Sequence, residues 1–154
     1  MRSKLYLLFI LIFILSIQLS SKAQLWFEDF KAAKAEAAST GKYMFLNFSG
    51  SDWCVWCIKL DEEVLSQKPF LDYAKDHLVL TLLDFPRSIK QSQALKTQNE
   101  NLAREYGVLG FPTIIILDPK GQLVAKTGYR QGGAEAYVTY IKSLIQEYET
   151  KHTY

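Results

Sequence analysis

The sequence predicts a single α/β domain in which a central mixed β-sheet is flanked by helices. Three observations support this fold class. Apolar, β-prone segments alternate with segments of helical periodicity along the 154 residues. The last two strand-like segments are separated by the turn sequence DPKG at 118–121, so we expect them to pair antiparallel. The only two cysteines, Cys54 and Cys57, directly follow one strand-like segment and open a helical one.

The beginning of the chain differs from the rest in composition. Two basic residues stand near the start, and residues 5–15 are uncharged and almost wholly apolar. A polar stretch follows and ends at the small residue Ala23, which is the layout of a secretory signal peptide. The alternative is an uncleaved membrane anchor, but the apolar run is shorter than the ~20 residues that a spanning helix needs. We therefore expect a signal peptide at 1–23 and a folded domain at 24–154.

Removal of the signal peptide would leave a nearly neutral protein. The whole chain carries a net charge of +2, and Arg2, Lys4 and Lys22 lie in the segment that we expect to be removed, which leaves −1. A charge this close to zero gives no reason to expect nucleic acid or an anionic membrane surface as a partner. We expect a monomer that is periplasmic or otherwise exported, with membrane contact only through its N-terminal segment.

The first half of the domain alternates helical and extended segments. Residues 27–40 are rich in alanine and lysine, with apolar residues at helical spacing, and Gly41 is a suitable helix stop. Residues 43–48, YMFLNF, are apolar and β-prone and predict a buried strand. A second helix is expected from Cys54 to the break before Pro69, because apolar residues recur there at helical spacing.

The second half continues this alternation and ends in an amphipathic helix. The segments expected there are, in order, a short helix at 70–76, a strand at 78–85, a polar loop at 87–98, a helix at 99–106, two antiparallel strands at 113–117 and 122–126, and a helix at 134–148. This order of elements agrees with one mixed sheet covered by helices.

The spacing of Cys54 and Cys57 favours redox chemistry over other uses of cysteine. A bridge that closes only two intervening residues removes little entropy from the unfolded chain, so it would be a poor structural staple. A zinc site usually has four ligands, and neither His77 nor His152 stands at a familiar ligand spacing from the pair. Haem attachment needs a histidine after the second cysteine, where Ile58 stands. We therefore expect a redox-active disulfide, with no metal and no organic cofactor.

Two motifs together resemble the thioredoxin family. One is WCVWC at 53–57, directly after a strand, and the other is GVLGFPT at 107–113, at the start of the strand TIIIL. The resemblance extends over about 27–148 and implies a thioredoxin fold. It also implies that Cys54 and Cys57 are the catalytic pair, with Cys54 as the exposed nucleophile and Cys57 as the more buried cysteine that resolves the mixed disulfide.

The resemblance further implies roles for residues around the cysteines. Members of the family carry a cis-proline that faces the active site, which implies a cis bond between Phe111 and Pro112 and pairing of the Phe111 backbone with an extended substrate. Trp53 is expected to pack beside Cys54 and shield it. Trp56 stands between the cysteines, where we expect it to contact substrate.

Two departures from thioredoxin affect the proton chemistry. The strand before the motif carries Asn47 where thioredoxins keep a buried acid, and an amide cannot take up a proton from a thiol. Asp61 lies four residues after Cys57 on the same helix face. The stretch WCVWCIKLDEEVLS is similar to the C-terminal thioredoxin-like domain of the periplasmic reductase DsbD, which has an acid at that offset. Asp61 is therefore a candidate proton acceptor for Cys57, and the alternative is a solvated helix carboxylate.

The sequence thus predicts an exported thiol–disulfide oxidoreductase that acts on protein thiols and disulfides through Cys54 and Cys57. No histidine stands between the cysteines, which favours a reducing over an oxidising role. A redox partner that the sequence does not identify must recharge the dithiol. The alternatives are a non-catalytic binding module of the same fold and a thiol-based carrier of a soft metal such as copper(I).

Overall fold

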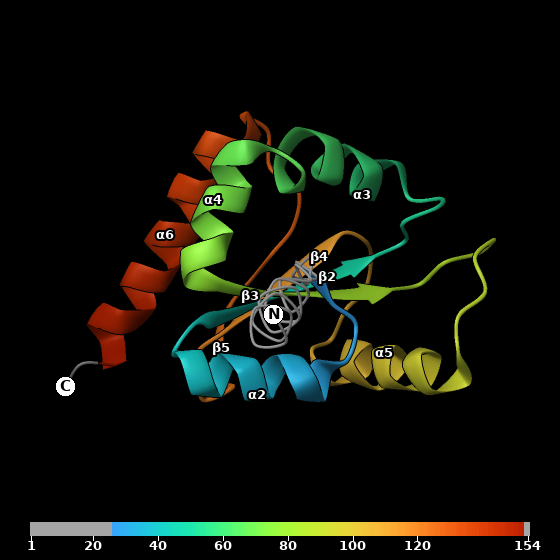
Figure 1. The fold of residues 1–154 in the computed structure, drawn as a ribbon. Helices are drawn as coiled ribbons and strands as arrows, with labels where there is room; N and C mark the ends of the chain where they lie inside the picture. The colour runs from blue at the N-terminus through green and yellow to red at the C-terminus, as the bar shows by residue number, and fades with distance from the viewer. Residues whose placement is uncertain (1–25, 153–154) are drawn as a thin grey trace, which may run out of the picture.

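The strands form one mixed five-stranded sheet, which confirms the predicted fold class (Figure 1). The computed structural model describes residues 26–152, so the predicted signal peptide at 1–23 lies outside the described residues. In sheet order the strands are β1 (Trp26–Phe27), β3 (Leu78–Asp84), β2 (Tyr43–Ser49), β4 (Thr113–Leu117) and β5 (Leu123–Thr127). β3 runs parallel to both β1 and β2, whereas β4 runs antiparallel to β2 and β5.

Helices cover both faces of this sheet (Figure 1). Their bounds are Phe30–Thr40 (α2), Val55–Leu60 (α3), Asp61–Leu65 (the π-helical turn η1), Lys68–His77 (α4), Gln93–Glu105 (α5) and Gly133–His152 (α6). α3, α4 and α6 lie on one face of the sheet, and α2 and α5 lie on the other. None of the helices within this described part of the chain is long and apolar enough to cross a membrane.

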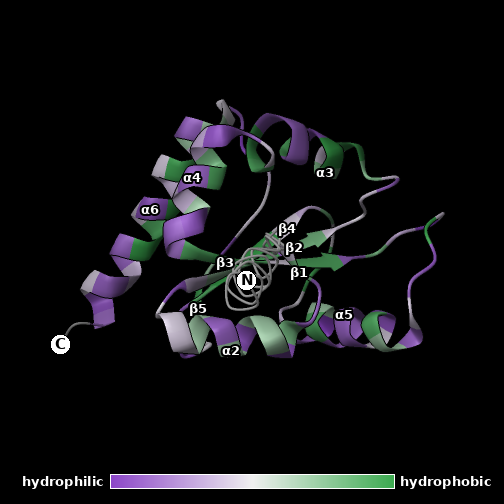
Figure 2. Ribbon diagram, in the orientation of Figure 1, coloured by the Kyte–Doolittle hydropathy of each residue, from purple (hydrophilic) through white to green (hydrophobic). Residues whose placement is uncertain are grey.

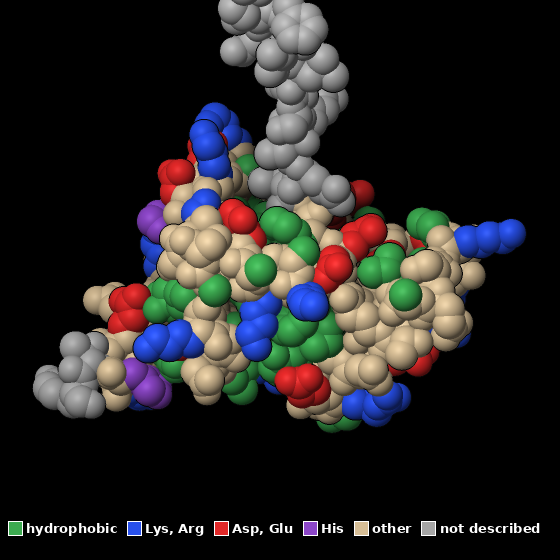
Figure 3. All heavy atoms as spheres, turned by 60° about the horizontal axis from the view of Figure 1, so that its bottom comes forward, with side chains coloured by type: hydrophobic (Ala, Val, Ile, Leu, Met, Phe, Trp, Pro, Cys, Tyr) green, Lys and Arg blue, Asp and Glu red, His purple; other side chains and the backbone are tan. Residues whose placement is uncertain are grey.

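The central strand β2 is buried on both of its faces. Successive side chains of a strand point to opposite faces, so Phe45 packs in the core beneath α4 and α6, whereas Met44, Leu46 and Phe48 pack in the core beneath α2. Figure 2 shows hydrophobic strands between helices of mixed hydropathy. On the face shown in Figure 3, acidic and basic side chains are interspersed. The loop that follows β2 therefore starts from a strand held by two cores.

The helix before β2 ends where the sequence predicts. Gly41 adopts a left-handed conformation with φ 71° and donates its N–H to the carbonyl of Ala37. The predicted start at Phe27 is wrong, because Trp26 and Phe27 pair with β3 and the helix begins after Asp29, whose carboxylate caps it. A two-residue strand is too short to leave a periodic pattern in the sequence.

Two other boundaries differ from the prediction for local reasons. The helical segment that starts after Cys54 does end before Pro69, but already at Leu65, and Pro69 lies in the first turn of α4, where its missing N–H costs no hydrogen bond. The helix expected at 99–106 begins earlier, at Gln93, because the Ser92 hydroxyl accepts a hydrogen bond from the Leu95 N–H and caps it. The polar loop after β3 is correspondingly shorter.

Candidate active site

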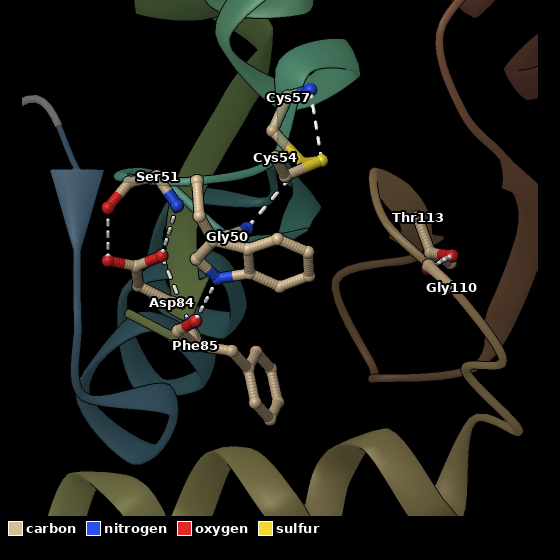
Figure 4. The surroundings of a disulfide bond; sticks show 9 residues. Gly50, Ser51, Cys54, Cys57, Asp84, Phe85, Gly110 and Thr113 are labelled. Carbon is tan, nitrogen blue, oxygen red and sulfur yellow. Dashed lines mark hydrogen bonds between the residues drawn. A yellow bond between two sulfur atoms is a disulfide. The ribbon is translucent and has the colours of Figure 1, made fainter. Parts of the chain in front are cut away.

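The two cysteines lie at the end of β2, where the chain turns into α3 (Figure 4). Cys54 occupies the N-cap position of α3 and has an extended backbone conformation. Its own N–H is bonded to the carbonyl of Gly50, which closes the turn between strand and helix. Cys54 and Cys57 are joined in a disulfide, with their Cα atoms 5.2 Å apart.

Each sulfur of this disulfide faces a backbone donor. The N–H of Cys57 points at the sulfur of Cys54 with a nitrogen–sulfur distance of 3.2 Å. The N–H of Gly50 points at the sulfur of Cys57 at 3.5 Å, and Figure 4 shows both contacts. Backbone donors at a helix start favour an anion, so the same geometry would stabilise a thiolate after reduction.

The two cysteines do not differ in exposure as the resemblance implied. Cys54 is 7% exposed and Cys57 is 5% exposed, so in the disulfide state both are buried. The sulfur of Cys54 is bonded to the sulfur of Cys57 and accepts a hydrogen bond from the Cys57 N–H. Both contacts direct the Cys54 sulfur over the first turn of α3 and away from solvent.

Trp53 joins three segments beside the disulfide. Its indole N–H donates to the carbonyl of Phe85 at the end of β3, at 2.8 Å. The Arg87 guanidinium carbon lies 3.7 Å from the ring centroid, and the ring of Phe111 meets Trp53 edge-on with centroids 6.0 Å apart. The ring lies so close to Gly50 that a Cβ there would come within 2.5 Å of it. Trp53 therefore packs on the cysteine turn at Gly50 and contacts Phe85, Arg87 and Phe111.

Two carboxylates hold the turn 50–54, and sequence reasoning did not identify either. Asp84 accepts hydrogen bonds from the N–H and the hydroxyl of Ser51, at 2.9 and 2.6 Å (Figure 4). Asp52 accepts the backbone N–H groups of residues 87–89, with a shortest distance of 2.6 Å. The backbone bonds from Arg87 and then Ser88 hold the pKa of Asp52 below its ordinary value. These contacts join segments more than 30 residues apart, which no local pattern reveals.

The second motif lies directly beside the first. The peptide bond between Phe111 and Pro112 is cis. The Phe111 ring contacts Trp53 and also Phe85, with centroids 4.9 Å apart in the second pair. The hydroxyl of Thr113 donates to the carbonyl of Gly110 at 2.7 Å, which holds the turn before β4 (Figure 4). The two motifs that resemble thioredoxin therefore meet at one site.

A pocket of about 320 Å³ with a lining of mixed polarity lies behind the disulfide. Its lining includes Cys57, Asn47, Asp61 and neighbouring residues of β2, α3 and β3. Asn47 is buried, and its side-chain oxygen has no hydrogen-bond partner among the described residues. Asp61 is exposed and accepts a hydrogen bond from the hydroxyl of Ser66 at 3.0 Å. The structure thus places Asp61, Cys57 and Asn47 of β2 on the lining of the same pocket.

Exposed apolar side chains border the disulfide. Trp56 is 54% exposed, and Val55 next to it and Leu109 before the cis bond are also exposed. Tyr129, which follows β5, packs against Trp56 with ring centroids 5.4 Å apart. Trp56 is a candidate from its place between the cysteines, whereas no local pattern indicates Tyr129, which only the fold brings to this side.

The histidines lie away from this site. His77 stacks on Tyr73 and His152 stacks on Tyr148, with ring centroids 4.6 and 4.1 Å apart. Within residues 26–152, no group of three or more histidine, cysteine, aspartate or glutamate side chains is arranged to hold a metal ion. The redox group present at the site is the Cys54–Cys57 disulfide itself.

Comparison with known proteins points to one family. A profile described as thioredoxin-like domain matches residues 30–143. The disulfide bond reductase DsbH of Chlamydia pneumoniae is 35% identical over 124 residues, which span 80% of this chain and 75% of that protein. A solved structure of a DsbH oxidoreductase has a TM-score of 0.76 at 33% identity and covers 84% of this chain and 90% of that one. The oxidised C-terminal domain of Neisseria meningitidis DsbD, at 20% identity, has a TM-score of 0.51 over 77% of this chain and 97% of that domain, a likeness of fold alone.

Proposed function

This chain belongs to the family of thioredoxin-like domains, and on that basis we propose that it is an exported thiol–disulfide oxidoreductase that reduces protein disulfides. The observation that carries the proposal is the Cys54–Cys57 disulfide at the start of α3, with a backbone N–H directed at each sulfur. The reducing direction is supported by similarity to a protein named as a disulfide bond reductase, with 35% identity.

The first step uses the reduced dithiol form of the protein. The Cys54 thiolate attacks one sulfur of a substrate disulfide, so that the substrate S–S bond breaks and a mixed disulfide with Cys54 forms. The departing substrate thiolate takes a proton from solvent. The N–H of Cys57 supports this step, because it points at the Cys54 sulfur and stabilises negative charge there before attack.

The second step releases the substrate. Cys57 loses its proton and attacks the Cys54 sulfur, which forms the Cys54–Cys57 disulfide and expels the second substrate thiolate. Two electrons have then passed from the protein to the substrate. Asp61 is proposed as the acceptor of the Cys57 proton, because the two residues line the same pocket. A thiol donor, oxidised to a disulfide in the exchange, must return two electrons to the protein.

Residues beside the disulfide are proposed to hold the substrate. The backbone of Phe111, adjoining Pro112, would pair with an extended substrate segment, as a strand pairs with a sheet edge. The Phe111 ring is fixed by Trp53, so this backbone is held close to the cysteine turn. Trp56 is exposed next to Cys57 and would contact the side chains that flank the substrate cysteine.

Export is proposed from the composition of residues 1–23, with the periplasm as the expected location. Expression of the full chain in a bacterium with an outer membrane, followed by mass measurement of the protein released from the periplasm, tests this directly. A mature mass that begins at Gln24 supports cleavage after Ala23. Recovery of the full-length chain in the membrane fraction would favour the anchor.

The reduction potential of the cysteine pair is the first property to measure. The mature protein is equilibrated with graded thiol/disulfide buffers, and the reduced fraction is read after acid quenching and alkylation. We expect a potential near or below about −250 mV, in the range of thioredoxin. A value near about −120 mV, as in DsbA, would contradict the reducing direction. A pair that never exchanges with the buffer would remove the catalytic function and favour the binding module.

Single-cysteine variants test the roles within the pair. Cys57→Ser should trap substrates as mixed disulfides on Cys54, because the residue that resolves them is missing. Cys54→Ser should form none and should have no reductase activity. A Cys54→Ser protein that retained its partner and its activity would show that the domain acts by binding and not by thiol exchange.

A further inference from the structure

One side of the disulfide carries an aromatic pair that the exchange steps themselves do not use. Trp56 in α3 lies against Tyr129 with ring centroids 5.4 Å apart and planes at 40°. The ammonium of Lys59 lies 5.7 Å from the Trp56 centroid and 5.9 Å from the Tyr129 centroid. Glu63 accepts a hydrogen bond of 2.6 Å from the Tyr129 hydroxyl and lies 3.4 Å from the Lys59 ammonium. We call these four residues the Trp56 cluster.

The Trp56 cluster joins two distant parts of the chain: Tyr129 packs against the hydrophobic core, whereas Trp56 lies outside it. Tyr129 follows β5, and the other three residues belong to α3 and η1, so the hydroxyl–carboxylate bond spans 66 residues of sequence. Trp56 nevertheless remains 54% exposed. A tryptophan half in water forgoes much of the gain from burial, and an exposed ion pair such as Lys59–Glu63 contributes little to stability. The cluster therefore holds an aromatic surface in place without burying it.

The charges within the cluster compensate each other. The hydrogen bond from Tyr129 and the nearby Lys59 hold the pKa of Glu63 below its ordinary value, so its carboxylate stays ionised at neutral pH. Because Lys59 lies against that carboxylate, the surface presents little net charge. Val55 and Ile58 in the same helix are exposed beside it. What the cluster offers to a molecule at the disulfide is an ordered, apolar and aromatic surface.

We propose that the Trp56 cluster selects substrate disulfides in which a large apolar side chain, best an aromatic one, adjoins the cysteine. Glu63 is a positioning residue in this proposal: it fixes Tyr129, and Tyr129 fixes Trp56. A surface ordered before binding loses less side-chain freedom when substrate arrives, so it binds more tightly than the same side chains left mobile. The proposal rests on the proposed function, because a substrate whose disulfide reaches Cys54 must lie next to Trp56.

The test compares three disulfide-linked peptides that differ only in the residue next to the cysteine, which is phenylalanine, glycine or glutamate. Reduction of each peptide by the reduced mature protein is followed at several concentrations. We expect kcat/KM for the phenylalanine peptide to exceed that for the glycine peptide by about two- to tenfold, the size of one aromatic contact, mainly through KM. The glutamate peptide should react no better than the glycine peptide.

Substitutions in the cluster should lower the ratio of kcat/KM for the phenylalanine peptide to that for the glycine peptide, by an amount that depends on which contact they remove. Glu63→Ala removes the acceptor for the Tyr129 hydroxyl, and Tyr129→Phe removes the hydroxyl, so each should bring the ratio of the phenylalanine to the glycine peptide close to one. Glu63→Gln keeps an acceptor and should retain most of the ratio. Tyr73→Phe is the matched control, because Tyr73 also lies under a lysine ammonium, that of Lys142 at 5.0 Å, but in α4. It should leave the ratio unchanged.

The results distinguish failure of the proposed substrate preference from failure of the proposed reductase function. An equal ratio in the unsubstituted protein and in Glu63→Ala would overturn the proposal, as would a preference for the glutamate peptide, which would mean that Lys59 makes the contact. If Glu63→Ala lowered kcat/KM equally for the phenylalanine and glycine peptides, so that their ratio did not change, the cluster would have a role in folding only. That result would also overturn the proposal. Failure of the unsubstituted protein to reduce any peptide would overturn the proposed function. Thermal unfolding of each variant shows whether it is folded.

Discussion

Gly50→Ala is the substitution that most directly tests the packing of the cysteine turn. A Cβ at this position would lie 2.5, 2.6 and 2.8 Å from Cε2, Nε1 and Cζ2 of the Trp53 ring. The ring has little freedom to give way, because its N–H is bonded to the carbonyl of Phe85 and the Arg87 guanidinium lies 3.7 Å from its centroid. A methyl group would therefore push the indole out of this place.

The loss in free energy of unfolding has two parts, each known to an order of magnitude. Forcing an extra carbon into a packed contact costs about 1–3 kcal/mol, and losing the bond from the indole of Trp53 to the Phe85 carbonyl costs about 0.5–1.5 kcal/mol. Together they lower the free energy of unfolding by about 1.5–4.5 kcal/mol. At roughly 4 °C per kcal/mol for a domain of this size, the melting temperature falls by about 6–18 °C.

Urea unfolding of the oxidised proteins, followed by circular dichroism, measures this difference. Gly110→Ala is the matched control on the opposite side of the site, because its Cβ would meet nothing within 4 Å and its backbone is not in the left-handed region. We expect the control to change stability by about 0.5 kcal/mol or less. Similar stability of Gly50→Ala and Gly110→Ala would refute the placement of the Trp53 ring over Gly50.

Three other substitutions probe the loops around the site. Backbone N–H groups lower the pKa of Asp52 below 3.8, so the ionised carboxylate stabilises the fold above that pH, and this stabilisation is lost as the pH falls further. The urea midpoints of the unsubstituted protein and of Asp52→Asn should therefore differ at pH 7 and converge toward pH 3. A difference that stays constant with pH would contradict this. Gly128→Ala places a Cβ 2.9 Å from the backbone oxygen of Pro112 and should lower the free energy of unfolding by about 1–3 kcal/mol in thermal melts, whereas an unchanged melt would exclude the close approach. Asp61→Asn should slow resolution by Cys57, so that mixed disulfide accumulates in acid-quenched reactions; an unaltered rate would make Asp61 a solvated carboxylate.

The central strands were predictable from the sequence because their pattern is local. β4 has the predicted bounds, and β2 extends the predicted strand by the single residue Ser49. Both segments are short apolar runs with turn residues at their ends, and both are buried on two faces, so composition alone distinguishes them from loops. The cysteine motif was equally readable, because its meaning depends on spacing and on the strand before it.

Contacts between distant segments were not predictable. In the sequence, Asp52 and Asp84 resemble ordinary surface acids. The partner of Asp52 is the backbone at 87–89 and that of Asp84 is Ser51, and these groups meet only because β2 and β3 lie side by side. The same holds for the bond between Glu63 and Tyr129. Hydrophobic periodicity reports which face of an element is buried, but it carries no information about which polar side chains meet across loops. The polar part of the site is therefore the part that required the structure.

The two edges of the sheet decide how readily another strand could add to it. One edge is β1, of which the described residues contain only Trp26 and Phe27, and these two residues offer few free backbone groups to an added strand. The other is β5, where Lys126 reaches across to donate to the carbonyls of Tyr106 and Gly107 at the end of α5. A strand edge that is short, or that carries a charged side chain, is a poor template for β-aggregation. A sheet built in this way resists growth by added strands.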